Sequence, residues 1–206
     1  GWQTADEYLS GNVRQKLRTA QRVAARDPFF AGNVDALIAA QPKDLEASEI
    51  EVRLGATWFD KKYIEQFMYE TFETPRYLRG QIEISYVPYT AEWQVSRKSM
   101  VRYNDVAAFT TYGTDRASAY RLLEDALNLR DIRIYDTIED ADGRERRVLN
   151  AKETTLAAQK QQLIRDAFKD WIWKDPERRE TLVRQYNEEM NSTRPREYDG
   201  SHIVFS

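Results

Sequence analysis

The residues with the clearest chemical potential lie between positions 76 and 103, where basic and aromatic side chains are interleaved. The basic members are Arg76, Arg79, Arg97, Lys98 and Arg102, and only Glu83 and Glu92 oppose them. The aromatic members are Tyr77, Tyr86, Tyr89, Trp93 and Tyr103. Because cationic side chains neutralise phosphates and aromatic rings stack on bases, this composition is typical of a DNA-contacting surface. The competing interpretation is structural, since aromatic residues on strands usually face a core and basic residues usually face solvent.

Two smaller arginine clusters are further candidates for phosphate contact. One follows a predicted turn and consists of Arg144, Arg146 and Arg147, and the other lies near the C-terminus and consists of Arg194 and Arg196. The net charge of -3 argues against a dedicated nucleic-acid binder, whose domain is normally basic. A local basic face and ordinary solvated charges are both compatible with that balance.

Catalytic chemistry lacks its usual residues in this sequence. The chain has no cysteine and one histidine, His202, which leaves no thiolate nucleophile and no histidine cluster for zinc. It also lacks a GxxxxGK[ST] phosphate loop, a GxGxxG turn and the Asn/Asp-Pro-Pro-aromatic tetrapeptide of adenine methyltransferases. We therefore predict no catalytic, cofactor-binding or metal-binding residues. Carboxylate pairs for acid–base catalysis are the one alternative that the sequence does not exclude, because such pairs are defined by distance in space.

The acidic run from Asp140 to Gly143 resembles part of a calcium-binding loop, but its register fails. With Gly143 at the loop's glycine position, the first and last ligands would be Ile138 and Leu149, which have no side-chain oxygen. This segment is therefore predicted to be a solvated hairpin end.

The N-terminal third reads as helical. Thr4 and Glu7 have capping-box spacing, residues 10–12 interrupt the helix, and apolar residues then recur with a period of 3.6 until Asp27 and Pro28. Asn33 is predicted to cap a second helix, which makes residues 13–42 a helical hairpin. Residues 50–54 alternate between apolar and charged residues, which favours a short strand. Asp60 is predicted to cap the next helix, which ends near residue 75.

The remainder mixes strands and helices. Alternating apolar residues from position 82 to 103 predict a β meander, and a helix is expected over 117–127. Residues 132–148 predict a β hairpin with a two-residue turn at Asp142-Gly143. Asn150 and Glu153 open a long helix, and Asp175-Pro176 opens a last one. The apolar residues 203–205 end the chain as they would where a longer protein continues.

These elements predict an α+β fold with an N-terminal helical hairpin, a small antiparallel meander and hairpin, and two C-terminal helices. We divide it into a mainly helical subdomain, 1–75, and an α+β subdomain, 76–206, which can pack as one domain. No apolar run has the length of about 18 residues that a membrane span needs, and the N-terminus has no signal-peptide pattern. The absence of cysteine agrees with a reducing compartment, so we expect a cytoplasmic protein.

Several strings of the chain resemble a known protein family. They include DEYLSGNVR at 6–14, RLGATW at 53–58, AYRLL at 119–123, TTLA at 154–157, FKDWIW at 168–173 and YDGSH at 198–202. Together they are similar to the region just before the helicase core in very large helicase and adenine-specific DNA methylase proteins of phages, plasmids and integrative elements. One departure is Phe59-Asp60, where the family has an apolar residue followed by proline.

The resemblance implies a parent protein that uses ATP, Mg and S-adenosylmethionine, with those reactions placed in the flanking helicase and methylase modules. It carries no catalytic residue onto this chain. We therefore expect a non-catalytic accessory domain that positions DNA, with the neighbouring modules as partners. The rival hypothesis is a spacer that packs on those modules without touching DNA, which the net acidity favours. A third class, an independent hydrolase or nuclease, would require a carboxylate cluster that holds a divalent metal.

Overall fold

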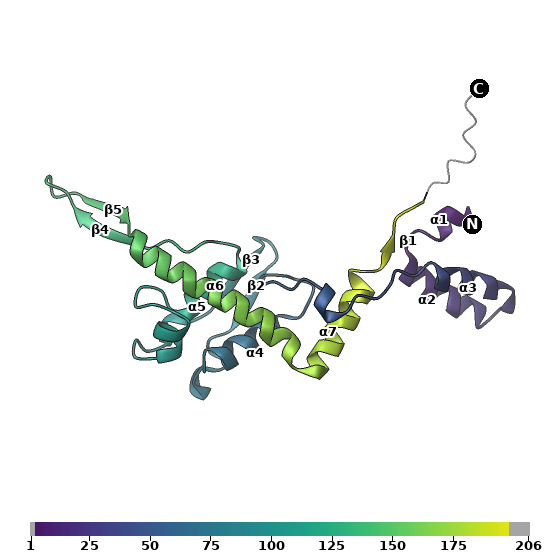
Figure 1. The fold of residues 1–206 in the computed structure, drawn as a ribbon, viewed down its shortest axis with the longest axis horizontal. Helices are drawn as coiled ribbons and strands as arrows, with labels where there is room; N and C mark the ends of the chain where they lie inside the picture. Colours follow the sequence, from purple (N-terminus) through teal and green to yellow (C-terminus); the bar gives the residue numbers. More distant parts are fainter. Residues whose placement is uncertain (1–2, 198–206) are drawn as a thin grey trace, which may run out of the picture. The chain divides into compact units, whose positions relative to one another are not determined.

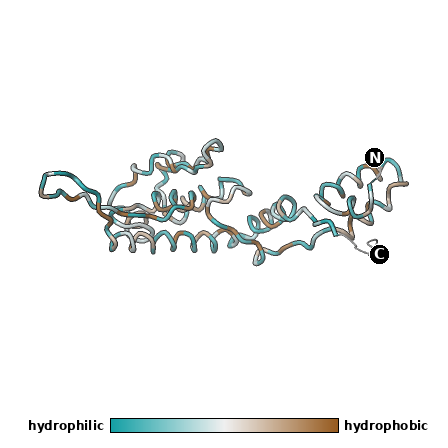
Figure 2. Tube along the Cα trace, turned by 90° about the horizontal axis from the view of Figure 1, so that it is seen from above, coloured by the Kyte–Doolittle hydropathy of each residue, from teal (hydrophilic) through white to brown (hydrophobic). Residues whose placement is uncertain are grey.

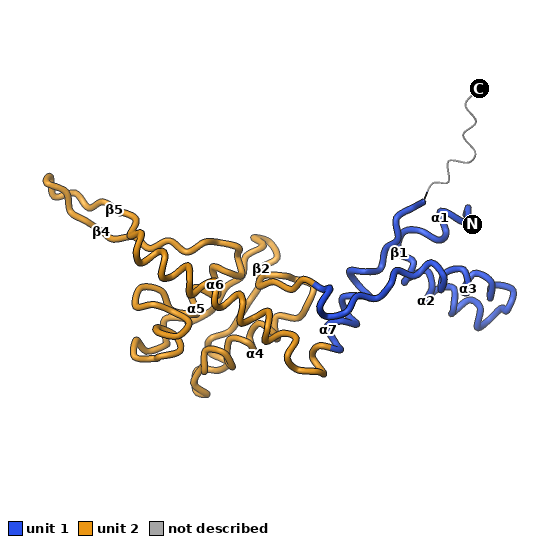
Figure 3. Tube along the Cα trace, viewed as in Figure 1, with its two compact units in different colours: residues 1–50, 180–206 blue, residues 51–179 orange. Residues whose placement is uncertain are grey.

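The computed structural model describes residues 3–197, which fall into two compact units (Figure 3). Unit 1 contains residues 1–50 and 180–206, and unit 2 contains residues 51–179. Helices and small antiparallel sheets occur together, which confirms the predicted α+β class. The predicted division at residue 75 differs from these units. His202 and residues 203–205 lie outside the described residues.

Unit 1 is built around a helical hairpin. It contains α1 (Ala5–Tyr8), β1 (Gly11–Asn12), α2 (Val13–Ala24), α3 (Ala31–Ala39), part of α7 (Pro176–Glu189) and β6 (Thr193–Arg194) (Figure 1). The side chain of Asn12 accepts a hydrogen bond from the Gln15 amide at 2.9 Å, which caps α2. Helices α2 and α3 pack through Val13, Ala20 and Leu37, so the predicted hairpin is present.

A buried asparagine joins α7 to the segment that follows the helical hairpin in unit 1. Asn187 is 4% exposed, and its amide group donates to the Leu45 carbonyl at 2.8 Å and accepts from the Leu45 amide at 2.8 Å. Nearby, the Arg14 guanidinium donates to the Asn191 carbonyl at 2.9 Å and pairs with Asp44. Because a buried polar group is expensive unless it is hydrogen-bonded, these contacts specify one position for the segment.

Unit 2 carries most of the fold. Its helices are α4 (Lys61–Thr71), α5 (Ala119–Leu127), α6 (Ala151–Lys174) and the first residues of α7, and its strands are β2 (Ile84–Val87), β3 (Glu92–Val95), β4 (Tyr135–Glu139) and β5 (Glu145–Leu149). Strands β2 and β3 pair with each other, and so do β4 and β5, both antiparallel. The long helix α6 contacts α4 and α5 on the side where the core lies (Figure 1).

An aromatic cluster fills the core of unit 2. The rings of Phe67 and Phe168 meet edge to face at 5.1 Å, which joins α4 to α6. The rings of Phe72 and Tyr120 meet at 5.2 Å, and the Tyr120 hydroxyl lies 2.6 Å from the Thr74 hydroxyl. Edge-to-face ring pairs contribute about 0.5–1.5 kcal/mol each beyond area burial. The core therefore requires α4, α5 and α6 together, which is why a boundary at residue 75 does not separate two cores.

One glycine permits a close approach of two backbones in unit 2. Gly55 has φ +86°, and a Cβ atom built on it would lie 2.2 Å from the Leu127 carbonyl oxygen. The Gly55 carbonyl also accepts from the Trp93 indole at 3.3 Å. Only glycine adopts this conformation without strain and leaves room for the end of α5.

Local expectations in the N-terminal half need correction. Thr4 does precede α1, but its hydroxyl donates to the Glu7 carboxylate at 3.4 Å and no side chain caps the helix. Asn33 lies inside α3 because a 3-10 turn at Pro28–Phe30, capped by Asp27, starts the helical path earlier. Residues 50–54 show the predicted alternating burial, but no strand pairs with them among the described residues.

The predicted strands of unit 2 also need correction. The meander is only a two-stranded hairpin, since residues after Val95 turn into a 3-10 segment at Lys98–Met100. In the second hairpin the Asp140 amide donates to the Arg144 carbonyl, which leaves a three-residue loop with Gly143 at φ +74°. The prediction of a two-residue turn is therefore wrong. The loop is a type I turn followed by a glycine bulge.

Candidate nucleic-acid interface

The β2–β3 hairpin gives the 76–103 region a rigid support. The Trp93 amide donates to the Asn128 side chain at 2.8 Å, and the Val95 amide donates to Glu124 at 2.8 Å. The rings of Trp93 and Tyr86 pack at 4.9 Å, and Trp93 is 5% exposed. For Trp93 the structural interpretation therefore holds, because its ring is buried.

The other aromatic side chains of this region face solvent. Tyr77 is 63% exposed, Tyr89 98% and Tyr103 85%. An Arg97 amino group donates to the Gln81 side chain at 3.4 Å, and Gln81 donates to the Tyr77 carbonyl at 2.7 Å. The Gln81 side chain therefore bridges the Arg97 guanidinium and the backbone of Tyr77, two residues that are distant in sequence.

We call Arg76, Tyr77, Arg97, Arg102 and Tyr103 the arginine–tyrosine group. Its five members are exposed, and within residues 3–197 none of its three arginines pairs with a carboxylate. Arg97 adopts φ +48°, a left-handed conformation that disfavours a side chain by about 1–2 kcal/mol. These guanidinium groups keep hydrogen-bonding capacity for an external anion.

The remaining two basic residues of the region serve the fold. The Arg79 guanidinium donates to the Thr74 carbonyl at 2.9 Å and lies over the Tyr69 ring. The Lys98 ammonium lies 2.7 Å from a Glu124 oxygen, and that carboxylate also accepts from the β3 backbone. A phosphate would have to compete with these internal partners, so the structure separates Arg79 and Lys98 from the arginine–tyrosine group.

The arginines of the β4–β5 hairpin do not form one patch. Successive residues of a strand face opposite sides, so Arg146 and Arg147 point away from each other. The Arg147 guanidinium lies 4.7 Å from the centre of the Tyr135 ring, which is a cation–π contact. Arg144, at the loop, is exposed, and Glu139 faces Glu145 across the ladder. The hairpin projects beyond α6 and is largely hydrophilic (Figures 1 and 2).

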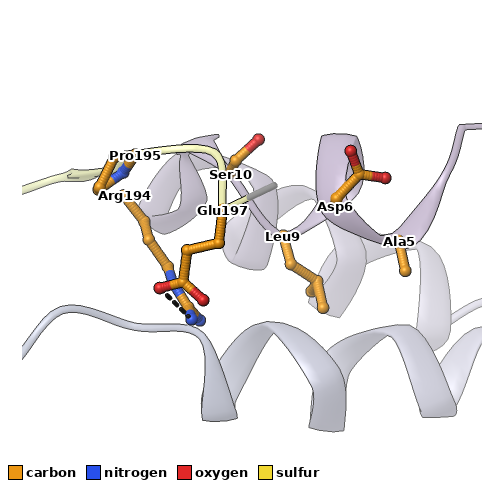
Figure 4. A pocket seen from close by; sticks show the side chains of 7 residues that line it. All are labelled: Ala5, Asp6, Leu9, Ser10, Arg194, Pro195 and Glu197. Atoms are coloured by element: carbon orange, nitrogen blue, oxygen red, sulfur yellow. Dashed lines mark hydrogen bonds and ion pairs between the residues drawn. The ribbon is translucent and has the colours of Figure 1, made fainter. Parts of the chain in front are cut away.

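The tail arginines are paired with acidic side chains in unit 1. Arg194 lies 3.1 Å from a Glu197 oxygen, and both line a pocket of about 380 Å³ beside α1 (Figure 4). Arg196 lies 2.5 Å from an Asp6 oxygen. Hydrogen bonds to Asp6, first from Thr4 and then from Arg196, hold the pKa of its carboxyl below the usual value. These two arginines are therefore less available to DNA than the arginine–tyrosine group.

The sequence reasoning missed a cationic cleft in unit 2. Arg53, Arg165 and Lys169 line a cavity of about 410 Å³, which we call the Arg53 cleft. Its other lining residues are Glu51, Leu54, Ala126, Leu129, Asp131 and Gln162. The spacing of Arg165 and Lys169 on one helix face was visible in the sequence, but nothing placed Arg53 opposite them.

In unit 2, the pKa values of several groups that support the fold are shifted. Burial raises the pKa of Tyr120 to about 12, and burial also raises the pKa of the Asp125 carboxyl. Hydrogen bonds from Arg116 and then Asn150 lower the pKa of Asp136 and anchor the root of the β4–β5 hairpin.

Metal-binding clusters and membrane-spanning helices are absent from the described part of the chain. Among residues 3–197, no three His, Cys, Asp or Glu side chains are grouped as a metal site requires. None of the described helices combines the length and apolar character needed to cross a bilayer. What the geometry does offer is a two-unit α+β protein with exposed cationic and aromatic side chains on unit 2.

Comparison with known proteins identifies the family but not an activity. A family model described as "Domain of unknown function (DUF8437)" matches residues 53–192, so the chain belongs to that family. No curated protein and no solved structure matches the chain. The matched region contains the arginine–tyrosine group and all but Glu51 of the residues that line the Arg53 cleft.

Proposed function

We propose that this chain is a non-catalytic accessory domain that positions DNA through phosphate contacts. The observation that carries the proposal is the arginine–tyrosine group, in which Gln81 links the Arg97 guanidinium to the Tyr77 backbone and Arg97 has no internal carboxylate partner among the described residues. Phosphate contacts of this kind orient a duplex or strand but read no sequence.

The resemblance of the sequence supports a particular setting for this role. In a helicase and adenine-specific DNA methylase, the domain would lie between the module that transfers a methyl group from S-adenosylmethionine and the module that hydrolyses ATP with Mg. Its partners would be DNA and those two modules, and its compartment the cytoplasm. The domain itself would hold no cofactor and would act by keeping DNA aligned.

Fluorescence anisotropy of labelled DNA titrated with the chain tests the proposal. We expect binding at low salt that weakens steeply between about 50 and 200 mM salt, because each neutralised phosphate releases counterions. The triple variant R76Q/R97Q/R102Q should lower the slope of log affinity against log salt by about 2–3, at about 0.7–0.9 per contact.

The control is the triple variant R26Q/K43Q/K152Q, which removes the same charge from exposed positions outside the arginine–tyrosine group. It should bind DNA within about twofold of the unmodified chain, since long-range charge alone is screened over about 10 Å in 0.1 M salt. Equal losses in both triple variants would show that net charge, and not this group, governs binding.

A specific observation favours a second function, a spacer that packs on neighbouring domains. In unit 1, Phe29 is 81% exposed and Ile38 is 54% exposed. A cavity of about 590 Å³ lined by residues that include Tyr8, Leu9 and Phe30 is present in the same unit. Exposed apolar side chains that gather on one unit are typical of a protein contact.

The spacer function makes a different prediction about association. Mixing the chain with separately produced flanking modules, followed by analytical ultracentrifugation, should show a complex that the variant F29S/I38S weakens at least tenfold. Salt-dependent DNA binding by the chain alone would favour the DNA-positioning function instead.

A further inference from the structure

We propose that the Arg53 cleft holds one nucleotide of a single-stranded nucleic acid, with the phosphate among Arg53, Arg165 and Lys169. The inference rests on the proposed DNA contact and adds a site that the sequence did not suggest. The cleft volume of about 410 Å³ lies within the usual range of about 300–1,000 Å³ for small-ligand sites.

The charges that line the cleft point to an anion. Arg165 and Lys169 are four positions apart on α6, so two like charges are neighbours on one helix face. Arg53 reaches the same cavity from the extended segment before α4. Within the described residues, no hydrogen bond or ion pair engages the side chains of Arg53 or Lys169, and both residues are exposed.

The two acidic residues of the lining only partly offset these cations. Asp131 lies 3.7 Å from Arg165, beyond hydrogen-bond distance, and its side chain is 90% exposed. Glu51 is exposed on the segment that carries Arg53. Exposed pairs of this kind are weak because water screens them, so the cleft keeps one more positive than negative charge.

The apolar part of the lining suits a sugar or base. Leu54 is 4% exposed and Ala126 is 1% exposed, and together they give the cleft a buried apolar wall. Leu129 follows the end of α5. Its amide donates to the Ala126 carbonyl, and the Arg130 amide donates to the Asp125 carbonyl. Glycine is the usual residue at this left-handed position, yet a leucine stands there at φ +57° with 64% of its surface exposed.

A strained, exposed leucine beside a cationic rim has a simple explanation in ligand binding. A single strand offers both a phosphate for the cations and an apolar ring face for Leu129. A duplex has its bases stacked inside and presents phosphates alone. The cleft should therefore favour single strands over duplexes.

Anisotropy titrations of the full chain with a labelled thymine oligonucleotide of about 12 nucleotides, and with a matching duplex, test this inference. The double variant R165Q/K169Q should weaken single-strand binding at least tenfold and lower its salt slope by about 1.4, at about 0.7 per contact. Duplex binding should change less than about threefold, and K152Q on the same helix should leave both unchanged.

The variant L129G separates a binding role from a structural one. Since glycine fits the left-handed position better, L129G should raise the melting temperature measured by circular dichroism while weakening single-strand binding. Amide chemical shifts should move at residues 51–54 and 162–169 when a 5′-phosphorylated thymidine dinucleotide is added.

Three results would overturn the inference or its assignment of Leu129. Unchanged single-strand affinity in R165Q/K169Q, together with a loss in R76Q/R97Q/R102Q, would refute the cleft as a binding site and leave the proposed function in place. If the unmodified chain shows no salt-dependent binding of any DNA, both the cleft site and the proposed function are refuted. A lower melting temperature and unchanged affinity in L129G would show that the leucine serves only the fold.

Discussion

Replacement of Gly55 by alanine should destabilise unit 2 through two separable effects. The first is the left-handed conformation at φ +86°, which disfavours a Cβ atom by about 1–2 kcal/mol. The second is the overlap of the new Cβ with the Leu127 carbonyl oxygen at 2.2 Å, which forces two backbones apart and costs about 1–3 kcal/mol. The expected loss of unfolding free energy is therefore about 2–5 kcal/mol.

Two other glycines of unit 2 isolate these effects. Gly80 has φ +80° with nothing within 4 Å of a built Cβ, so Gly80→Ala should cost only the conformational part, about 1–2 kcal/mol. Gly113 lies outside the left-handed region, but its Cβ would lie 1.9 Å from the Ala108 carbonyl oxygen. Gly113→Ala should therefore cost the overlap part, about 1–3 kcal/mol.

Urea unfolding followed by tryptophan fluorescence provides the measurement. Four of the five tryptophans, Trp58, Trp93, Trp171 and Trp173, lie in unit 2, and the Trp93 indole donates to the Gly55 carbonyl. Most of the emission signal therefore reports on the unit that carries the substitution. Equal midpoints for Gly55→Ala and Gly80→Ala would refute the argument from close approach, because only the first brings a Cβ against backbone.

Other predictions concern helix caps, a buried amide and acid stability. Asp27→Ala should lower the melting temperature of unit 1 through a loss of about 1 kcal/mol, because the Asp27 side chain accepts from a backbone amide. Asn33→Ala should not lower it, because Asn33 lies inside α3. The reverse order in circular dichroism melts would contradict this assignment. Asn187→Leu should cost about 1–3 kcal/mol in urea unfolding, since the Leu45 amide and carbonyl lose their partner, and a neutral result would mean that water replaces it. The pKa of Asp136 is lowered in the folded state, so its stabilisation is present above the unfolded pKa of about 3.9 and is lost as pH falls through the folded pKa. Asp136→Asn should accordingly lower the melting temperature at neutral pH and flatten its decline in acid, and an unchanged acid profile would exclude this contribution.

Much of the fold follows from local sequence signals. Asn12, Asp60, Ser118 and Asn150 each accept a hydrogen bond from the first turn of a helix, and such caps are visible as residue types before a periodic apolar run. The β4–β5 hairpin was also visible, because alternation and a turn residue are local features. The predicted loop was one residue too short, because Gly143 fits both a two-residue and a three-residue loop. The Asp140 side chain, which accepts from the Asp142 and Arg144 amides, favours the longer loop.

The candidate site was less accessible to sequence reasoning. Residue type identified the arginines, but it could not separate Arg97, whose guanidinium hydrogen-bonds only the neutral Gln81 side chain among the described residues, from Lys98, whose ammonium is held by Glu124 on α5. Met100, Val101 and Tyr103 suggested a third strand after Val95, but only Val101 is buried, and a strand also requires a partner for its backbone. No partner segment lies beside residues 98–103 in the described structure.

The sequence by itself determined the α+β class, the starts of α4, α6 and α7 and the absence of cysteine, because these depend on residue types and on spacings within one or two turns. Tertiary structure decided which cations keep free hydrogen-bonding groups, since a carboxylate or carbonyl from a distant element had to arrive beside each one. Tertiary structure also forms the Arg53 cleft, where a segment ending at Gly55 meets the end of α5 and one face of α6. That meeting depends on long-range packing against Leu127, and no local pattern in the chain encodes it.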